Sequence, residues 1–162
     1  MSSGSVSAKG NQLGGYVDIE SEGFIRLLSS KIDVAGNTQG GLVRIGGEFQ
    51  GNNNLTRTEE QQDVFVDRWG ERRSLTNAKT VLVSDGSRID ISSSNGKAGT
   101  AIIWSDQETT MLGNIIATGT IGGAVEISSK DTLRHVGLSN VNISEGGHLL
   151  PVSYTHLRAH ET

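Results

Sequence analysis

Short apolar runs alternate with glycine-rich corners along most of the chain. The clearest case is residues 113–127, where Ile115-Ile116 and Val125-Glu126-Ile127 flank a turn that ends in Gly122-Gly123. Because strand side chains alternate between two faces, we expect Val125 and Ile127 to point into a core and Glu126 into water. The glycine pair would supply the unusual backbone angles of a tight corner. This stretch predicts one coil of a stacked β-solenoid.

The same pattern recurs at intervals of similar length. Related stretches occupy residues 14–19, 40–45, 99–104 and 146–150, and most follow a partner run, at 32–34, 89–91, 115–117 or 141–143. The steps from Gly14 to Gly40, from Gly99 to Gly122 and from Gly122 to Gly146 are 26, 23 and 24 residues. Repeats of this length are typical of solenoids, in which each unit buries its apolar face against its neighbours. We therefore predict an all-β solenoid.

Three segments depart from the repeat, which otherwise covers residues 14–150. Residues 1–13 are rich in Ser and Gly and are expected to form a frayed entry. Residues 48–79 are polar, with one strand-like run at 64–66, and read as an insertion or long loop on a solenoid face, where binding sites of repeat proteins often lie. Residues 151–162 share nothing with the repeat and resemble a translated sequencing adapter, so we expect an artefactual, unstructured tail; a genuine C-terminal tail is the alternative.

Composition narrows the possible classes of protein. The chain has 22 Gly, one Pro and 4% aromatic residues, which disfavours packed helices and favours short strands joined by turns. A net charge of −4 provides no basic footprint for nucleic acid. The absence of cysteine excludes disulfides and thiolate metal sites. No apolar run is long enough for a membrane-spanning helix, and the first residues lack the apolar region of a signal peptide. The sequence therefore reads as a piece of a longer protein.

Several motifs resemble those of a family of large secreted bacterial proteins. They are GLVRIGGEFQG at 41–51, IWSD at 103–106, GNI at 113–115 and GAVEISSK at 123–130. Together with the closing run at 146–150, they are similar to the filamentous haemagglutinin-like adhesins of Gram-negative bacteria, over roughly residues 10–150.

This resemblance implies a right-handed parallel β-helix that is secreted or displayed on the cell surface. It also implies export through an outer-membrane two-partner secretion transporter, and a receptor that is a glycan or protein on a host or neighbouring cell. The family has no universal catalytic residues and no cofactor to carry over.

Parallel β-helices also host polysaccharide lyases and hydrolases, which gather carboxylates on one face for acid–base work or cation binding. The candidates here are Asp63, Asp67, Asp85, Asp90 and Asp106. Asp33 and Asp90 occupy equivalent places in their coils and are expected to face solvent. Because no basic or His partner recurs beside these aspartates, we favour ordinary outward strand residues.

Other chemistry has weaker support in the sequence. There is no G-x-S-x-G motif, and His135 and His148 read as lone surface or turn residues. The calcium-binding nonapeptide repeat is absent. The EEQQD run at 59–63 could hold a cation weakly, but a solvated loop is favoured. No metal or cofactor site is therefore predicted.

The most unusual local patch is RWGERR at residues 68–73. Arg68, Trp69, Arg72 and Arg73 could contact a sulfated or sialylated glycan through stacking and charge. The alternative, which we favour, is that Trp69 pins the insertion to the solenoid while the arginines are solvated. Trp104 is predicted to be an inward core residue.

The sequence as a whole predicts a non-catalytic structural or adhesive segment of a secreted surface protein. The alternatives are a carbohydrate-active β-helix enzyme and the stalk of a contact-dependent toxin. Aspartates gathered in one groove would favour the enzyme, whereas scattered aspartates would favour the stalk.

Overall fold

The computed structural model describes residues 4–53 and 55–154. These residues contain fourteen strands: β1 (Ser5–Ser7), β2 (Tyr16–Ile19), β3 (Phe24–Leu27), β4 (Lys31–Asp33), β5 (Leu42–Ile45), β6 (Thr80–Val83), β7 (Arg88–Asp90), β8 (Thr100–Ser105), β9 (Glu108–Met111), β10 (Asn114–Ala117), β11 (Ala124–Ser129), β12 (Thr132–Arg134), β13 (Val141–Ile143) and β14 (His148–Ser153). A short 3₁₀ helix, η3 (Leu138–Asn140), precedes β13.

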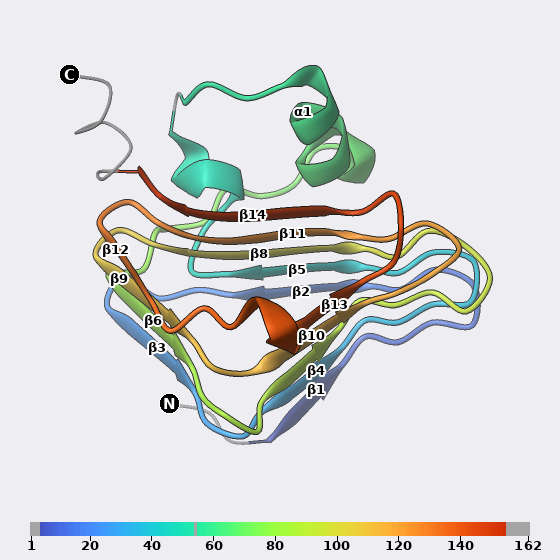
Figure 1. Cartoon of the computed structure of the whole chain (residues 1–162), viewed down its shortest axis with the longest axis horizontal. Helices are drawn as coiled ribbons and strands as arrows, with labels where there is room; N and C mark the ends of the chain where they lie inside the picture. Colours follow the sequence, from blue (N-terminus) through green and yellow to red (C-terminus); the bar gives the residue numbers. More distant parts are fainter. Residues whose placement is uncertain (1–3, 54, 155–162) are drawn as a thin grey trace.

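The strands form three sheets in which every pairing is parallel. Sheet I has the order β1-β4-β7-β10-β13, sheet II β14-β11-β8-β5-β2 and sheet III β12-β9-β6-β3. The chain visits sheets I, II and III in turn, and the sheets form the sides of a triangular outline in Figure 1. The prediction of an all-β, parallel, solenoid-like fold is confirmed, and its right-handedness stays a prediction.

Inward side chains of successive coils stack in register and make up the core. Ile45, Ile103 and Ile127 lie opposite one another in sheet II, and each is fully buried. Ile89 and Ile115 are paired in the same way in sheet I. Burial of each such side chain contributes about 1.5–3 kcal/mol, so the apolar positions of the repeat supply the main stabilisation of the stack.

The corner glycines allow close approach between coils. A Cβ on Gly41, Gly99 or Gly123 would lie 2.0, 1.8 or 2.5 Å from the carbonyl oxygen of the equivalent glycine in the preceding coil. Neither Gly122 nor Gly123 has a positive φ, so the prediction of unusual backbone angles at this pair is wrong. Among the corner pairs, Gly146 does adopt a positive φ, of 81°.

Both ends of the described chain are more ordered than expected. β1 pairs with β4, with Val6 opposite Ile32, so the predicted frayed entry is wrong for residues 5–7. At the other end, residues 151–153 continue β14 beside β11, and Tyr154 is buried against Trp104 with ring centroids 5.6 Å apart. The predicted unstructured tail is therefore wrong for residues 151–154. Residues 1–3 and 155–162 lie outside the described residues, and the adapter resemblance stays a prediction.

The predicted insertion leaves the solenoid between β5 and β6 and contains short helices. These are the 3₁₀ segment η1 (Phe49–Asn52), α1 (Glu59–Phe65) and the 3₁₀ helix η2 (Asp67–Trp69). Thr58 and Gln61 form a capping box at the start of α1, each side chain accepting a hydrogen bond from the other's backbone N–H at 3.0 Å. The strand-like reading of residues 64–66 and the loop reading of 59–63 are therefore wrong, because both belong largely to this capped helix.

The insertion lies over the outer face of sheet II (Figure 1). Consequently every residue of β5, β8 and β11 is buried, on the outward as well as the inward face. Glu126 is fully buried, and the prediction that it faces water is wrong. Trp104 is also fully buried, but it opposes outward-facing Ser128, so its predicted inward orientation is wrong as well.

Within the described residues, no helix combines the length and apolar character required to cross a bilayer.

Candidate functional site

Several buried polar side chains lie between the insertion and sheet II. The first is Glu126, in the middle of β11. One carboxylate oxygen, Oε1, accepts a hydrogen bond from the backbone N–H of Gln50 at 3.0 Å. The other, Oε2, has no hydrogen-bond partner among the described residues. Burial raises the pKa of Glu126 to about 8, against the opposing effects of the Gln50 N–H, the Ser128 hydroxyl, the charge of Arg57 and Tyr154.

A carboxyl group with a raised pKa is a frequent feature of acid catalysts. Glu126, however, is covered by η1 and has no solvent exposure, so a substrate cannot reach it in this conformation. Its carboxyl group instead links the sheet to the insertion. Because the protonated form tolerates burial better than the ionised form, covering Glu126 with the insertion is expected to cost least when its carboxyl group is neutral.

Trp104 provides the second contact between sheet and insertion. Its indole N–H donates to Asp106 Oδ1 at 3.0 Å, and the Asn77 side-chain amide donates to the same oxygen at 3.1 Å. Gly51 lies directly over the indole with φ of 65°, and a Cβ there would come within 2.2 Å of Trp104 Cε2. Asp106, one of the predicted catalytic candidates, is therefore engaged in fixing the covered tryptophan.

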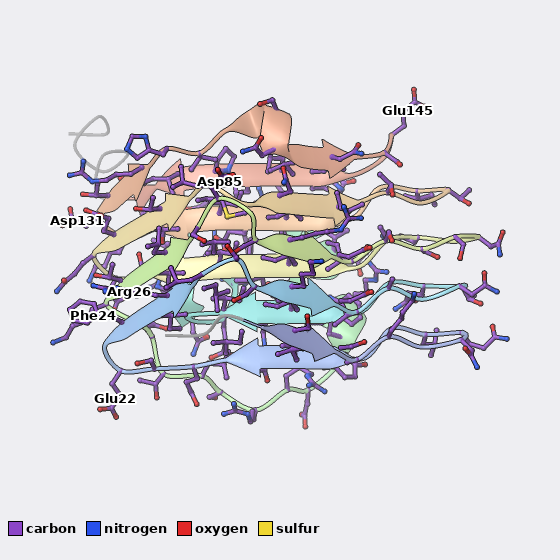
Figure 2. All side chains as sticks on the ribbon, turned by 90° about the horizontal axis from the view of Figure 1, so that it is seen from below. Glu22, Phe24, Arg26, Asp85, Asp131 and Glu145 are labelled. Carbon is purple, nitrogen blue, oxygen red and sulfur yellow. The ribbon has the colours of Figure 1, made fainter. Side chains whose placement is uncertain are left out.

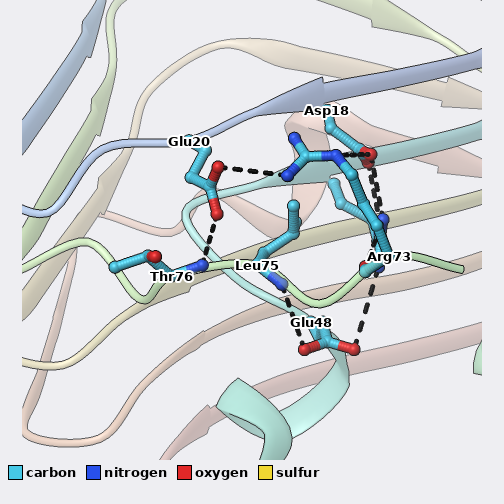
Figure 3. A network of polar contacts seen from close by, with 7 residues as sticks. Asp18, Glu20, Glu48, Arg73, Leu75 and Thr76 are labelled. Atoms are coloured by element: carbon cyan, nitrogen blue, oxygen red, sulfur yellow. Dashed lines mark hydrogen bonds and ion pairs between the residues drawn. The ribbon is translucent and has the colours of Figure 1, made fainter.

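A network of arginines and carboxylates fastens the far end of the insertion (Figure 3). The buried Arg44 binds both carboxylate oxygens of Asp18, at 2.8 and 2.9 Å, and donates to the backbone carbonyl of Arg73 at 3.2 Å. Arg73 in turn pairs with Glu20 at 3.2 Å and lies 3.8 Å from Asp18. Asp18 and Glu20 belong to the first coil and its following turn, so the network links that coil, the second coil and the insertion.

Two further carboxylate contacts complete the network (Figure 3). Glu48 accepts from the backbone N–H of Leu75 at 3.3 Å. Glu20 accepts from the backbone N–H of Thr76, and this bond, followed by the side chain of Arg73, lowers the pKa of Glu20. These carboxylates were not singled out from the sequence. Their partners lie tens of residues away, so only the insertion itself, as a polar break in the repeat, could have pointed to them.

Two arginines of the predicted glycan patch lie over aromatic rings, and one of these rings is Trp69 of the same patch. Tyr16 and Trp69 meet edge to face with centroids 5.9 Å apart, Arg68 lies over Trp69 at 4.6 Å and Arg72 over Tyr16 at 3.8 Å. Trp69 is only 7% exposed. It pins the insertion to the first coil and has little ring surface left for a sugar, whereas Arg73 is committed to Asp18 and Glu20. A glycan contact at these four residues stays a prediction.

Arg68 and Trp69 also leave polar atoms without partners. Both terminal nitrogens of Arg68 and Nε1 of Trp69 are buried without a hydrogen bond among the described residues. Burial lowers the pKa of Arg68 to about 10, and the charge of Asp63 raises it in part. Because unpaired buried polar atoms cost stability, the patch is less firmly attached than the Arg44 network.

The remaining predicted aspartates are distributed over different parts of the molecule. Asp63 lies on α1, Asp67 follows that helix and accepts from Gln62 at 2.8 Å, and Asp85 lies in the turn between β6 and β7 (Figure 2). Asp90 and its neighbour Asp33 lie side by side in sheet I.

Asp33 and Asp90 each accept a hydrogen bond at 2.9 Å from the backbone N–H two residues further along the chain. This local bond is an ordinary turn contact of aspartate. Within residues 4–53 and 55–154, no cluster of three His, Asp or Glu side chains could hold a metal ion.

The two histidines have different surroundings. His148 Nε2 lies 3.2 Å from Glu60 Oε1, connecting β14 to α1, so its reading as a lone residue is wrong. His135 is exposed and has φ of 53°, as expected for a turn position. Neither histidine adjoins a nucleophile in the contacts described above.

The insertion and sheet II border a half-open cavity of about 460 Å³ with a largely apolar interior. Leu42 and Ile102 contribute outward side chains of sheet II, and Phe49 and Phe65 come from the insertion. The two phenylalanine rings stack with centroids 4.3 Å apart and planes 6° from parallel. Trp69 completes the apolar lining. A cavity of this size and composition can accommodate a small organic ligand.

Comparison of the chain with models of protein families, with curated proteins and with solved structures returned no match.

Proposed function

We propose that this chain is a non-catalytic structural or adhesive segment of a large secreted surface protein of a Gram-negative bacterium, similar to filamentous haemagglutinin. The observation that carries the proposal is the role of the carboxylates that surround the insertion. Asp18, Glu20, Glu48 and Asp106 are each engaged by arginines, amides or the Trp104 indole in attaching the insertion to the parallel stack. These carboxylates hold a structure together, as expected of a scaffold.

In this proposal the stacked coils act as a stiff, right-handed rod, and the insertion is the part presented to a receptor. Stiffness follows from the in-register apolar core and from hydrogen bonds that run between coils along every sheet. The expected partners are an outer-membrane two-partner secretion transporter and a glycan or protein on a host or neighbouring cell. The motifs at 41–51 and 123–130 are the basis for these partners.

The complete reading frame around this chain provides the most direct test. We expect a two-partner secretion domain upstream and further β-helix repeats on at least one side. A reading frame without a secretion domain or repeats would contradict the proposal. A toxin domain downstream would instead identify the parent as a toxin carrier.

A biochemical test addresses catalysis separately. The purified chain would be incubated with a panel of acidic and neutral polysaccharides, and new reducing ends and unsaturated products would be measured. The proposal predicts no product above the level given by heat-denatured protein. Sustained product formation, abolished by substitution of one of the predicted aspartates, would favour the carbohydrate-active enzyme.

A further inference from the structure

We propose that the cavity between the insertion and sheet II binds a small organic ligand with an apolar, ring-sized body and a cationic group. This inference goes beyond adhesion, because it concerns a small molecule held under the insertion. It also does not depend on the parent protein being an adhesin.

The first support is the shape and lining of the cavity. Its volume of about 460 Å³ falls within the usual range of small-molecule sites. Leu42 and Ile102 of sheet II and the stacked Phe49 and Phe65 of the insertion are almost fully buried and form its apolar floor. Val66 and Gly70 line its more accessible part, so an apolar body resting there would contact both the sheet and the insertion. Such a body would gain stabilisation from burial without leaving protein polar groups unpaired.

The second support is that the walls are fixed by contacts outside the cavity itself. The Thr100 hydroxyl donates to the Val64 carbonyl at 2.8 Å, which holds the end of α1 onto β8. On the opposite side, the buried Arg44 is held by its paired bonds to Asp18. A cavity whose walls are already held requires little ordering when a ligand enters, which favours binding.

The third support is the distribution of charge around the cavity. Three acidic residues line it, Glu48, Asp67 and Glu71, together with two basic residues, Arg44 and Arg72. The charge of Arg44 is matched by Asp18, as described above, and Arg72 lies over the ring of Tyr16.

Glu71 differs from the other charged residues of the lining. It is exposed and has no hydrogen bond or ion pair among the described residues. Arg72 keeps its charge over the Tyr16 ring, but with Arg44 paired to Asp18 the lining holds three acidic residues against this one basic residue. An acidic excess of this kind attracts cations more than anions.

The proposal is tested with three probes that share one ring and differ in charge. Phenethylamine is cationic, 2-phenylethanol neutral and phenylacetate anionic at pH 7. Binding to the whole chain would be followed by titration calorimetry and by chemical shifts of the Trp69 and Phe65 side chains. We expect saturable binding of phenethylamine, at least about tenfold tighter than phenylacetate, a ratio that corresponds to about 1.4 kcal/mol. No saturable binding of any probe, or equal affinity for the cation and the anion, would overturn the proposal.

Two variants locate the binding event. Val66→Trp places a bulky ring in the cavity and should abolish phenethylamine binding, with an unchanged circular dichroism spectrum as evidence of folding. Glu71→Gln should lower the preference for phenethylamine over 2-phenylethanol by roughly threefold or more, consistent with the loss of one exposed charge.

The matched control is Glu22→Gln, which removes the same charge from the exposed turn between β2 and β3 (Figure 2). It should leave the preference unchanged. If Val66→Trp does not fold, the two glutamate variants still decide the outcome. An equal response to Glu71→Gln and Glu22→Gln would contradict a site at this cavity.

Discussion

Sheets II and III follow the same strand pattern but differ on their outer faces. In β3, β6 and β9 of sheet III, buried inward residues alternate with more accessible outward ones. In β5, β8 and β11 of sheet II, both sets are buried. Phe24 and Arg26 project from β3 into solvent (Figure 2), whereas Ile102 and Glu126 lie under the insertion.

The difference shows that one insertion changes the environment of the outward positions of the repeat. The inward positions are equivalent in both sheets, because each coil must bury its apolar side chains against the next. The outward positions of sheet II carry a second, smaller core made by Phe49, Val64 and Phe65 against Ile102 and Ala124. Outward residues of sheet II should therefore affect stability far more than outward residues of sheet III.

The largest effect is expected at Gly99, in the corner that leads from sheet I into β8 of sheet II. Gly99→Ala would place Cβ 1.8 Å from the Gly41 carbonyl oxygen, and the coils would have to separate. We expect a loss of more than about 4 kcal/mol in the free energy of unfolding, measured by chemical denaturation. Gly23→Ala, whose Cβ would meet only Ser21 Oγ at 4.0 Å, serves as control and should change stability by less than about 1 kcal/mol. Similar losses for the two variants would contradict the close-approach role of Gly99.

The second prediction compares the loss of a buried ion pair with the loss of an exposed one, both in the network that attaches the insertion. Arg44→Ala leaves Asp18, only 12% exposed, without its bidentate partner and should cost about 3–5 kcal/mol. Arg73→Ala removes pairs of an arginine that is 58% exposed and should cost less than about 1 kcal/mol. Denaturation of both variants in low and high salt would check the ranking. A larger loss for Arg73→Ala would place the main attachment elsewhere.

A matched pair of aliphatic truncations compares the two outer faces directly. Ile102→Ala empties a position that is 2% exposed beneath the insertion and should cost about 2–4 kcal/mol. Leu82→Ala removes a larger share of accessible surface from β6 and should cost less than about 1.5 kcal/mol. Unfolding free energies of the two variants give the comparison. Equal values would mean that the insertion does not pack on sheet II.

The fourth prediction concerns the pH dependence of stability. Its direction follows from the raised pKa of Glu126. An acid whose pKa is higher in the folded than in the unfolded state holds its proton more tightly when folded. Stability therefore falls as pH rises from about 4.5, the ordinary value, through about 8. Glu126→Gln removes this dependence and should be more stable than the parent by roughly 1–4 kcal/mol at pH 9, but not at pH 4.

Glu108→Gln is the control for the pH experiment. Glu108 lies on the uncovered face of sheet III and pairs with the exposed Arg134 at 2.9 Å. Unfolding of both variants would be measured between pH 4 and 9. We expect only Glu126→Gln to flatten the pH profile. A parent protein whose stability rises between pH 5 and 8 would show that Glu126 is not buried under the insertion.

The solenoid could be predicted from the sequence because its signal is local and repeated. Paired apolar positions such as Val125 and Ile127 recur with corner glycines, and the resulting inward stacks are those of the structure. β1 was missed because its single apolar residue, Val6, gives no period by itself. The corner glycines were located correctly, but their physical role depends on the neighbouring coil and is invisible in one strand.

The interface beneath the insertion could not be predicted in the same way. The outward orientation of Glu126 was predicted correctly and that of Trp104 was not, although the register places both on the same face. The burial of both side chains depends on residues 48–79, which have no repeat to align them. The helix α1 did carry a local signal, the Thr58–Gln61 capping box, that the apolar run at 64–66 obscured. The contacts of Arg44 with Asp18 and Arg73 span three segments of the chain and have no counterpart in another coil.

The most direct test of the covered face compares two threonines in a chain that contains no cysteine. Thr100→Cys lies under α1 in sheet II, and Thr110→Cys occupies an outward position of β9 in sheet III. The rate of reaction with a thiol reagent would be measured under native conditions for both variants. We predict that Cys at position 100 reacts at least about a hundredfold more slowly, corresponding to an opening free energy of about 3 kcal/mol. Equal rates would contradict a sheet buried on both faces.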